Sequence, residues 1–403
     1  MLPKQTEAGN PDFRIWDGKG KIIGYVEAKT PGSRLERVAQ SEQLRRYRET
    51  FDNVVLTDFL HFVLFREGVE VAHAELGDAV ALTLGHVPPL KDVEGTVELF
   101  TRFFDYRLPE RLGPKTLAER LARLTRFLRD QVIEEELRRG KESKLYGFFE
   151  TFKEVLIADL NERQFADLFA QTLTYGLFAA RIRAGKGEFN RKLAYALIPH
   201  TLGVLRDVFK FISMADLPPH LEVTLDDIAA VLEVADVNEI LAEYQRSRGS
   251  RDPIVHFYET FLAEYDPELR ERRGVYYTPE PVVHYIVESV HKLLQSRFSK
   301  LLGLAEEGVT LLDPGAGTLT FPAVAVERAT EVYAKAYGEG GLSKLLRERI
   351  LPNYFAFELM MAPYAVGHLK IGLVFEALGY RLSENERSTS TSPTPWSLSA
   401  LSR

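Results

Sequence analysis

The sequence of 403 residues contains no cysteine, only two tryptophans and only four methionines. Without cysteine the chain can form no disulfide and can hold no zinc through thiolates. Its nine histidines show no paired ligand spacing, so any bound metal must be held by oxygen ligands. Mg²⁺ is the natural candidate for such ligands.

Long apolar runs are also missing. No stretch approaches the ~20 apolar residues that cross a bilayer, and Met1 to Asn10 lacks the apolar centre of a signal peptide. We therefore expect no membrane partner, no secretion and a cytoplasmic location. The pattern Gly-x-x-x-x-Gly-Lys-Ser/Thr does not occur either, which excludes an ATP motor of the P-loop type.

The residues that are present indicate a globular protein with two or three packed domains, because 45% are hydrophobic and 27% are charged. The formal charge of −7 argues against unspecific binding of polyanions by the whole surface, but it leaves a local basic groove open. Basic clusters occur at Arg45 to Arg48, Arg120 to Lys144 and Arg270 to Arg273. For each cluster we favour a solvated helix face over a DNA contact.

Residues 12 to 73 have the pattern of a small mixed α/β unit. Phe13 to Trp16 and Lys21 to Ala28 are apolar runs separated by turn residues, which predicts a β-hairpin. A helix is expected from Leu35 to Thr50. Three further strands are predicted at 54–57, 59–66 and 69–73, with Glu67-Gly68 as a turn, and the unit is expected to end near Gly95.

From Val97 to about Leu269 apolar residues recur every three or four positions, which predicts an almost entirely helical connector. Breaks in this pattern are expected at Pro114, at 185–187, at Pro218-Pro219 and in the polar loop 246–252.

The last unit alternates helix and strand. We expect helices at 281–298, 322–337 and 362–378 and strands at 309–312 and 354–358. From Arg387 the chain is rich in serine, threonine and proline without apolar periodicity, so it supplies no further strand. The last unit is therefore predicted to be the first half of a doubly wound sheet, and the whole chain an α/β multidomain protein.

A glycine-rich turn, Asp313-Pro-Gly-Ala-Gly-Thr318, joins the first of these strands to its helix. Backbone N–H groups and the helix N-terminus would face a bound ligand there. Asp313 can meet a cationic amine, and Glu358, at the end of the next strand, can bind two ribose hydroxyls. The alternative is a purely structural turn, with Glu358 beside a helix N-terminus.

Together with Gly274-Val-Tyr-Tyr-Thr-Pro279 and Phe355-Ala-Phe-Glu358, this turn resembles the N6-adenine DNA methyltransferase domain of single-chain restriction-modification enzymes, Type IIG or Type ISP-like. The resemblance implies S-adenosylmethionine as the cofactor. The residues that would bind it are Tyr277, Thr278 and Pro279 for the methionine part, Asp313, Gly315 and Gly317 for the amino acid end, and Glu358 for the ribose.

The sequence departs from this family in two ways. Leu319 replaces a residue that is usually small, which puts the close packing of the turn in question. The catalytic motif of the family, Asn or Asp followed by Pro-Pro and an aromatic residue, grips a flipped adenine, and nothing like it follows Glu358. We therefore expect a chain truncated within the methyltransferase domain and no methyl transfer by this chain alone. The abrupt change of composition near residue 387 suggests a frameshift, and the alternative is that the tail is genuine.

A second group of chemically competent residues lies near the N-terminus. Asp12 is followed fifteen positions later by Glu27 and then by Lys29, on adjacent strands of the predicted hairpin. Two carboxylates can hold Mg²⁺ against a scissile phosphate, while a lysine orients or deprotonates the attacking water. Gln43 and Tyr47, four apart on the next helix, share one face. The alternative is an exposed hairpin with salt-bridged charges.

This group resembles the PD-(D/E)XK nuclease at the N-terminus of the same restriction-modification enzymes, including its Gln-x-x-x-Tyr helix. The resemblance implies that Asp12 and Glu27 bind the metal and that Lys29 is catalytic, with Gln43 and Tyr47 supporting the catalytic site. The family usually has a helix with another acidic residue before the first strand, whereas only eleven residues precede Asp12 here.

The predicted organisation is a PD-(D/E)XK nuclease-like domain (1–95), a helical connector (96–270), a partial S-adenosylmethionine-dependent methyltransferase domain (271–386) and a tail expected to be disordered (387–403). The first interpretation is part of a restriction-modification enzyme that acts on double-stranded DNA, an adenine-N6 methyltransferase with a fused Mg²⁺-dependent endonuclease. The alternative is a catalytically incomplete fragment that binds DNA or S-adenosylmethionine. A small-molecule methyltransferase is disfavoured by the group around Asp12.

Overall fold

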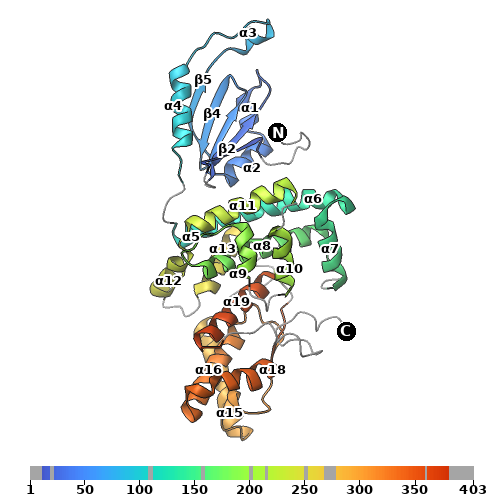
Figure 1. The fold of residues 1–403 in the computed structure, drawn as a ribbon, viewed down its shortest axis with the longest axis vertical. Helices are drawn as coiled ribbons and strands as arrows, with labels where there is room; N and C mark the ends of the chain where they lie inside the picture. Colours follow the sequence, from blue (N-terminus) through green and yellow to red (C-terminus); the bar gives the residue numbers. More distant parts are fainter. Residues whose placement is uncertain are drawn as a thin grey trace.

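The computed structural model describes residues 11–18, 22–107, 112–155, 159–198, 203–213, 217–248, 253–266, 278–358 and 361–380. They form three parts along the long axis of the molecule (Figure 1): a sheet part, a helical middle part, and a last part of helices with two short strands. The predicted α/β multidomain class is confirmed. Tyr277, the basic cluster at 270–273 and the tail at 387–403 lie outside the described residues. Within the described ranges, no helix is long and apolar enough to cross a membrane.

The sheet part contains five strands in the order β1-β2-β3-β4-β5. They are β1 (Phe13–Trp16), β2 (Ile22–Ala28), β3 (Asn53–Thr57), β4 (His61–Arg66) and β5 (Val69–Glu75). β1 and β2 form the antiparallel hairpin that the sequence predicts, β2 and β3 run parallel, and the other neighbours are antiparallel. β3 is buried along its whole length, as is usual for a central strand with both faces covered.

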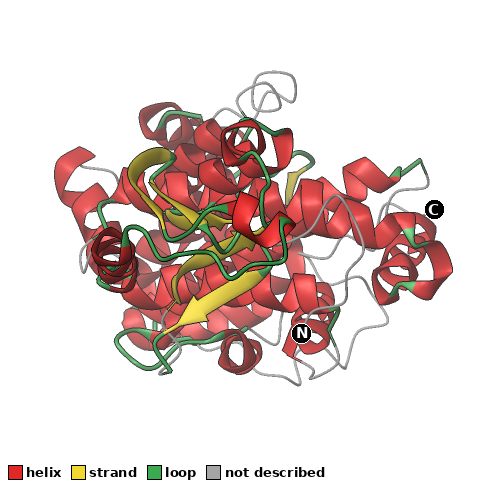
Figure 2. Ribbon diagram, turned by 90° about the horizontal axis from the view of Figure 1, so that it is seen from above, coloured by secondary structure: helices red, strands yellow, loops and turns green. Residues whose placement is uncertain are grey.

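Helices cover both faces of this sheet. In Figure 2, which looks down on the molecule from above, the strands of the sheet lie in front of the helices. On one face lie α1 (Leu35–Ala39) and α2 (Glu42–Thr50), whose Leu44 and Tyr47 share a core with β3. On the other face lies α4 (Val93–Phe104), which packs through Leu99 and Phe103. α3 (Ala79–Thr83) precedes it. The boundary predicted near Gly95 thus falls inside a helix that belongs to the sheet part.

Two predicted elements of the sheet part need correction. The single helix expected from Leu35 to Thr50 is two helices, because Ser41 starts a new one by accepting the N–H of Leu44 at 3.3 Å. The strand expected from Phe59 begins only at His61, because Phe59 has a left-handed φ of 69° and cannot continue a strand.

The middle part is helical, as the sequence predicts. Its elements are α5 (Pro114–Phe127), the π-helical turn η1 (Leu128–Ile133), α6 (Glu134–Arg138), the 3₁₀ turn η2 (Gly140–Glu142), α7 (Lys144–Val155), α8 (Glu162–Ala184), α9 (Arg191–Leu197), α10 (Gly203–Ser213), α11 (Pro219–Val234), α12 (Val237–Arg248) and α13 (Pro253–Tyr265). Pro114 and Pro219 stand at the first turns of α5 and α11, where proline costs no hydrogen bond.

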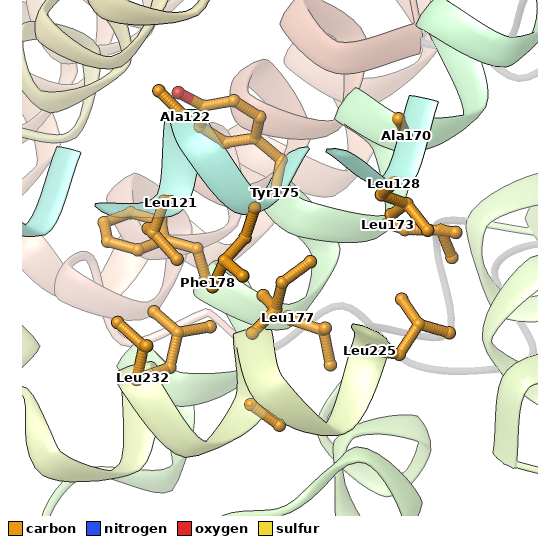
Figure 3. Close-up of a cluster of buried hydrophobic side chains, with 14 of the residues drawn as sticks. Leu121, Ala122, Leu128, Ala170, Leu173, Tyr175, Leu177, Phe178, Leu225 and Leu232 are labelled. Atoms are coloured by element: carbon orange, nitrogen blue, oxygen red, sulfur yellow. The ribbon is translucent and has the colours of Figure 1, made fainter. Parts of the chain in front are cut away.

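Apolar side chains at helical spacing form the core of the middle part. Figure 3 shows Leu121 of α5 and Phe178 of α8 with Leu225 and Leu232 of α11, and all four side chains are almost fully buried. Burying side chains of this size contributes about 1.5 to 3 kcal/mol each. The central helix α8 is therefore fixed from several sides.

The last part contains a two-stranded parallel sheet of β6 (Leu311–Asp313) and β7 (Tyr354–Ala356). Its helices and turns are α15 (Glu280–Arg297), η3 (Gly303–Ala305), α16 (Thr320–Tyr337), η4 (Glu339–Gly341), α17 (Leu342–Leu345), η5 (Leu346–Ile350), α18 (Leu351–Asn353) and α19 (Met361–Ala377). Both predicted strands are therefore found, in shorter form. The part has a core of its own, and Val366 and Leu369 of α19 join it to the core of the middle part.

Candidate functional site

The two acidic residues of the N-terminal group lie against each other. Glu27 is on β2 and only 3% exposed, while Asp12 immediately precedes β1. The Asp12 N–H donates to Glu27 Oε2 at 3.3 Å, and the Ala28 N–H donates to Asp12 Oδ2 at 2.8 Å. The hairpin pairing of β1 with β2 thus brings together residues that are fifteen positions apart.

Lys29 completes this group. Its Nζ donates to Glu27 Oε1 at 2.5 Å, and its backbone N–H donates to the carbonyl of Thr57 at 2.7 Å, which extends the parallel pairing of β2 and β3. Burial raises the pKa of Glu27, and the negative charge of Asp12 adds to this effect while Lys29 opposes it. Glu27 is therefore a carboxylate that gains from a nearby cation.

Gln43 and Tyr47 of α2 lie at the same place. Gln43 Nε2 donates to the Tyr47 hydroxyl at 3.0 Å. The Tyr47 side chain is buried, and its pKa is raised by that burial and then by the negative charges of Glu27 and Asp12. Tyr47 therefore stays a neutral hydrogen-bonding group beside the carboxylates. The structure brings together all five residues that the sequence singled out, from two strands and one helix.

These residues fit a magnesium ion of the kind that acts on phosphates. In the described part of the chain, no group of three or more acidic or histidine side chains is placed to hold a metal. Mg²⁺ commonly binds through one or two carboxylates together with water and substrate phosphate oxygens. Asp12 and Glu27 supply that pair, and burial raises the pKa of Glu27 although Lys29 is paired with it.

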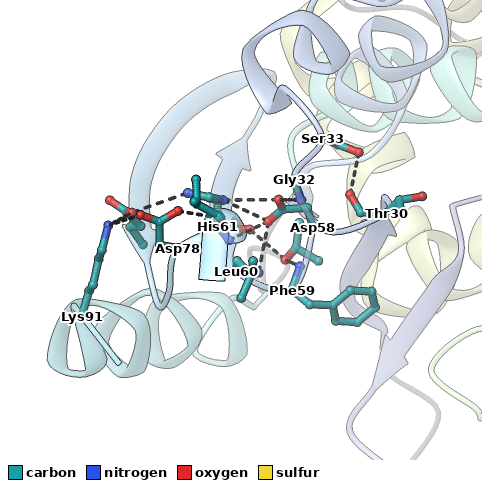
Figure 4. Close-up of polar contacts among 12 residues, drawn as sticks. Thr30, Gly32, Ser33, Asp58, Phe59, Leu60, His61, Asp78 and Lys91 are labelled. Atoms are coloured by element: carbon teal, nitrogen blue, oxygen red, sulfur yellow. Dashed lines mark hydrogen bonds and ion pairs between the residues drawn. The ribbon is translucent and has the colours of Figure 1, made fainter. Parts of the chain in front are cut away.

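Asp58, a residue that the sequence analysis did not single out, fixes the loops next to this group. It follows β3 and is fully buried, and its carboxylate accepts the N–H groups of Gly32 at 2.8 Å, Leu60 at 3.1 Å and His61 at 2.7 Å (Figure 4). Burial opposes its ionisation, but these N–H groups outweigh burial and lower the pKa of Asp58. Asp58 thereby ties the loop after Lys29 to the end of β3. An aspartate that ends a strand and precedes a turn was the available signal.

The glycine-rich turn forms the second candidate site. Asp313 ends β6 and receives the Gly315 N–H on Oδ1 at 3.3 Å, while its Oδ2 is buried with no hydrogen-bond partner among the described residues. Burial raises the pKa of Asp313, and the Gly315 N–H opposes the rise only in part. A buried acceptor without a partner is costly, so this atom suits a cationic or donor group of a ligand.

The turn and the end of β7 are joined by hydrogen bonds. The Gly317 N–H donates to Glu358 Oε2 at 2.8 Å, and the Ala316 N–H donates to the Phe357 carbonyl at 2.9 Å. Gly317 has a left-handed φ of 54°, and a Cβ added at Gly315 or Gly317 would meet no atom within 4 Å. The turn therefore offers open space beside Asp313, which fits the amino acid end of S-adenosylmethionine.

The tyrosine motif is only partly described. Thr278 and Pro279 stand directly before α15, and Pro279 accepts the Val283 N–H at 3.2 Å as the helix begins. Among the described contacts, none joins Thr278 or Pro279 to the turn at Asp313. Their proximity to a cofactor stays a prediction.

Leu319 fits the turn although its side chain is large. Its φ is 58° and it is only 5% exposed, at the start of α16. Gly367 of α19 makes the room, because a Cβ at that position would lie 2.6 Å from Leu319 Cγ. The bulk at residue 319 is thus accommodated by a glycine from a distant helix.

The solved structures that resemble this chain include protein–DNA complexes, among them complexes of two Type ISP restriction-modification enzymes. A DrdV–DNA complex is 21% identical over 95% of this chain and 35% of that chain, with a TM-score of 0.47. A nuclease-deletion mutant of the Type ISP restriction-modification enzyme LlaGI, in complex with a DNA substrate mimic, is 18% identical over 75% of this chain and 23% of that chain, with a TM-score of 0.44. The ATP-dependent Type ISP restriction-modification enzyme LlaBIII bound to DNA is 21% identical over 70% of this chain and 18% of that chain, with a TM-score of 0.44.

This chain spans about a third of the length of the DrdV chain and less of the other two. No protein-family model matches the sequence, and neither does any curated protein. Likenesses at this level of identity and overlap do not show a shared activity.

Proposed function

We propose that the chain is part of a DNA restriction-modification enzyme and that its sheet part is a Mg²⁺-dependent endonuclease of the PD-(D/E)XK type. The observation that carries this proposal is the convergence of Asp12, Glu27 and Lys29 on one edge of the sheet, with Tyr47 beside them. Asp12 and Glu27 would hold Mg²⁺, which polarises the scissile phosphate when bound. Lys29, already paired with Glu27, would orient or deprotonate the attacking water.

The hydrogen bonding within this group suits the chemistry. Glu27 is held by hydrogen bonds from Asp12 and Lys29, so the ligand atoms are placed before metal or DNA arrives. The neutral Tyr47 can donate or accept a hydrogen bond without adding charge. A group that is already ordered loses little conformational freedom on binding, which favours phosphate chemistry.

The last part, by the same proposal, binds S-adenosylmethionine and belongs to an adenine-N6 DNA methyltransferase. Asp313 would receive the amine of the cofactor, and Glu358 would bind its ribose in exchange for the Gly317 N–H. The second candidate is a binding-only role for this part. Asp313 Oδ2 is buried and has no hydrogen-bond partner among the described residues, which favours cofactor binding under either candidate. The two candidates differ in whether a methyl group is transferred to adenine.

The nuclease proposal is tested with supercoiled duplex DNA and the full chain. We expect nicking that requires Mg²⁺, is lost in Lys29→Ala, and is kept in the control Lys344→Ala, an exposed lysine of α17 in the last part. Nicking that persists in Lys29→Ala, or that needs no divalent ion, would contradict the proposal. Both variants should match the wild type in thermal unfolding.

The cofactor proposal is tested with labelled S-adenosylmethionine. We expect saturable binding that Asp313→Ala abolishes. Transfer of the label to adenine in duplex DNA would support the methyltransferase, whereas binding without transfer would support the binding-only candidate. Absence of binding would exclude both.

A further inference from the structure

A groove with a volume of about 540 Å³ lies where the sheet part meets the middle part. One wall is α2, which carries Gln43 and Tyr47 of the candidate nuclease site. The other wall is the continuous helix formed by α5, η1 and α6. The groove therefore adjoins the helix that supports the candidate site.

Arginine is the basic residue of this groove, and no lysine lines it. The arginines come from four helices: α2, α5, α6 and α8. They are Arg46, Arg123, Arg126, Arg138 and Arg163. The planar guanidinium group can bind two phosphate oxygens at once, which the ammonium group of lysine cannot do.

The positive charge of the groove is only partly compensated. Three acidic residues also line it, Glu49, Asp130 and Glu134, and Asp130 is paired at 2.5 Å with Arg129, which lies outside the lining. Carboxylates outside the lining pair with three of its arginines: Glu42 with Arg46, Asp52 with Arg123 and Glu135 with Arg138. The guanidinium of Arg126 donates to the backbone carbonyls of Glu264 and Tyr265. Burial lowers the pKa of Arg126 most, and the positive charges of Arg129 and Arg123 lower it further, while Asp130 opposes this effect.

The π-helical turn η1 makes the second wall of the groove irregular. It supplies Asp130 and Gln131, and Gln131 Oε1 accepts a hydrogen bond from Arg46 at 3.1 Å. A π-helical turn inside an α-helix is rare and frequently occurs at functional sites. Here the hydrogen bond between Gln131 and Arg46 connects the two walls of the groove.

We propose that this groove binds the phosphate backbone of a DNA strand on its way to Asp12 and Glu27. The proposal rests on the nuclease function proposed above. It also changes the interpretation of the basic clusters, which the sequence analysis assigned to solvated helix faces. Arg48 and Arg120 do have structural roles, because Arg48 donates to the Gly68 carbonyl and Arg120 pairs with Asp52. Arg46, Arg123, Arg126 and Arg138 from the same clusters line the groove, where Arg123 shares Asp52 with Arg120 and Arg126 also binds two backbone carbonyls.

The test is the equilibrium binding of a short labelled DNA duplex to the full chain at several salt concentrations. Arg138 and Arg163 are the exposed members of the groove, so their replacement should leave the fold intact. In the double variant Arg138→Gln with Arg163→Gln, we expect Kd to rise about tenfold and the slope of log Kd against log salt to fall by about 2. The matched control replaces Arg297 and Arg347, two exposed arginines of the last part, by Gln and should bind as the wild type does.

Three outcomes would contradict the proposal that the groove binds DNA. If the double variant binds DNA as the wild type does, and the wild type still nicks DNA, the groove does not bind DNA but the nuclease proposal is kept. An equal loss in the control variant would show that general charge, not the groove, drives binding. A wild type that neither binds nor nicks DNA would remove both proposals. The variant Lys29→Ala separates DNA binding from DNA cleavage, because it should bind DNA normally while losing cleavage.

Discussion

The sheet part and the last part use the same local design with different surroundings. Each places an acidic residue near the carboxyl end of a strand that has a parallel neighbour, Glu27 on β2 and Asp313 on β6. β2 is paired on both sides and Glu27 has Lys29 as a built-in counterion. In the described residues β6 is paired only with β7, its Leu312 is 59% exposed, and Asp313 Oδ2 has no partner.

This difference shows what each carboxylate can do. Lys29 of the same chain partly neutralises the charge of Glu27, so the Glu27 side chain can stay ordered without a metal ion. A bound metal ion would add its positive charge to that of Lys29. Asp313 is given no counterion by the described part of the chain, so a cationic ligand would relieve the cost of its burial. We therefore expect the first site to tolerate the absence of ligand better than the second.

The two parts are also attached differently to the helical middle. Arg14 of β1 pairs with the fully buried Asp227 of α11 at 2.6 Å, and Tyr25 of β2 donates to the same carboxylate. The last part is attached through apolar contacts of Val366 and Leu369 and through one partly exposed ion pair, Arg183 with Glu376 at 3.1 Å. The first junction combines these buried charges with apolar packing of Tyr47 and Phe51 against Phe127, whereas the second is apolar apart from its ion pair.

The largest effect is expected for Glu27→Gln, which keeps the shape of the side chain but removes a metal ligand. DNA cleavage should fall about a thousandfold, equivalent to ~4 kcal/mol of transition-state stabilisation. Binding of S-adenosylmethionine should not change, because Asp313 lies in another part. The measurement is the single-turnover nicking rate at saturating Mg²⁺.

The pH dependence of cleavage by the wild type supplies a control for this prediction. Protonated Glu27 cannot hold a metal, and burial raises its pKa above the ordinary 4.5. Cleavage by the wild type should therefore decline with falling pH while the solution is still above pH 4.5. Wild-type cleavage rates in Glu27→Gln would exclude this residue as a ligand.

The second effect concerns the charged junction, where burial raises the pKa of Asp227 to about 6 although Arg14 and Tyr25 oppose the rise. Between pH 3.8 and about 6 the unfolded chain releases this proton while the folded chain keeps it. The free energy of unfolding should therefore fall as pH rises through this window, by about 2 to 3 kcal/mol more in the wild type than in Asp227→Asn. Urea unfolding at a series of pH values measures this difference.

Parallel curves for the two proteins would show that Asp227 keeps an ordinary pKa in the folded state. A steeper fall in the variant would contradict the assigned cause, because the asparagine side chain carries no titrating proton. No such pH effect is expected at the apolar junction of the last part.

The third effect tests the uncompensated carboxylate. Asp313→Asn should weaken the binding of S-adenosylmethionine about tenfold, or ~1.4 kcal/mol, because a charge-assisted hydrogen bond to the amine becomes a neutral one. DNA nicking should stay at the wild-type rate. Isothermal titration calorimetry provides the affinity, and an unchanged Kd would mean that the amine does not lie at Asp313.

The smallest effect distinguishes the two glycines of the turn. Gly317→Ala should lower the free energy of unfolding by about 1 kcal/mol, because φ at this position is 54° and a Cβ is strained there. Gly315→Ala is the matched control, since its φ is not positive and a Cβ there meets open space. Equal stabilities of the two variants would contradict the geometry of the turn.

Local patterns were enough to predict most of the elements. The hairpin of β1 and β2 follows from two apolar runs around turn residues, and Pro114 and Pro219 mark helix starts because proline lacks an N–H. The break between α1 and α2 was missed. It depends on the hydroxyl of Ser41 capping a new helix, and a serine inside an apolar pattern does not reveal this by itself.

The residues of the two sites differ in how well sequence could find them. Asp12, Glu27 and Lys29 lie within one hairpin, so their spacing already implied that they meet. Asp58 was missed although Leu60 and His61 are local partners, and the arginine groove was missed because its walls are distant in sequence. Asp58 binds the loop at Gly32, and Arg46 meets Gln131 across two parts of the molecule.

The sequence by itself determined the α/β class, the hairpin with its acidic pair and lysine, and the strand, glycine turn and helix around Asp313. Each of these depends on backbone preferences and side-chain periodicity over a few neighbouring residues. Only the tertiary structure decided that Gly367 makes room for Leu319, that Asp227 is buried against Arg14, and which arginines face a groove. Those features depend on packing between distant segments, and packing fixes the burial and the partners of each charge.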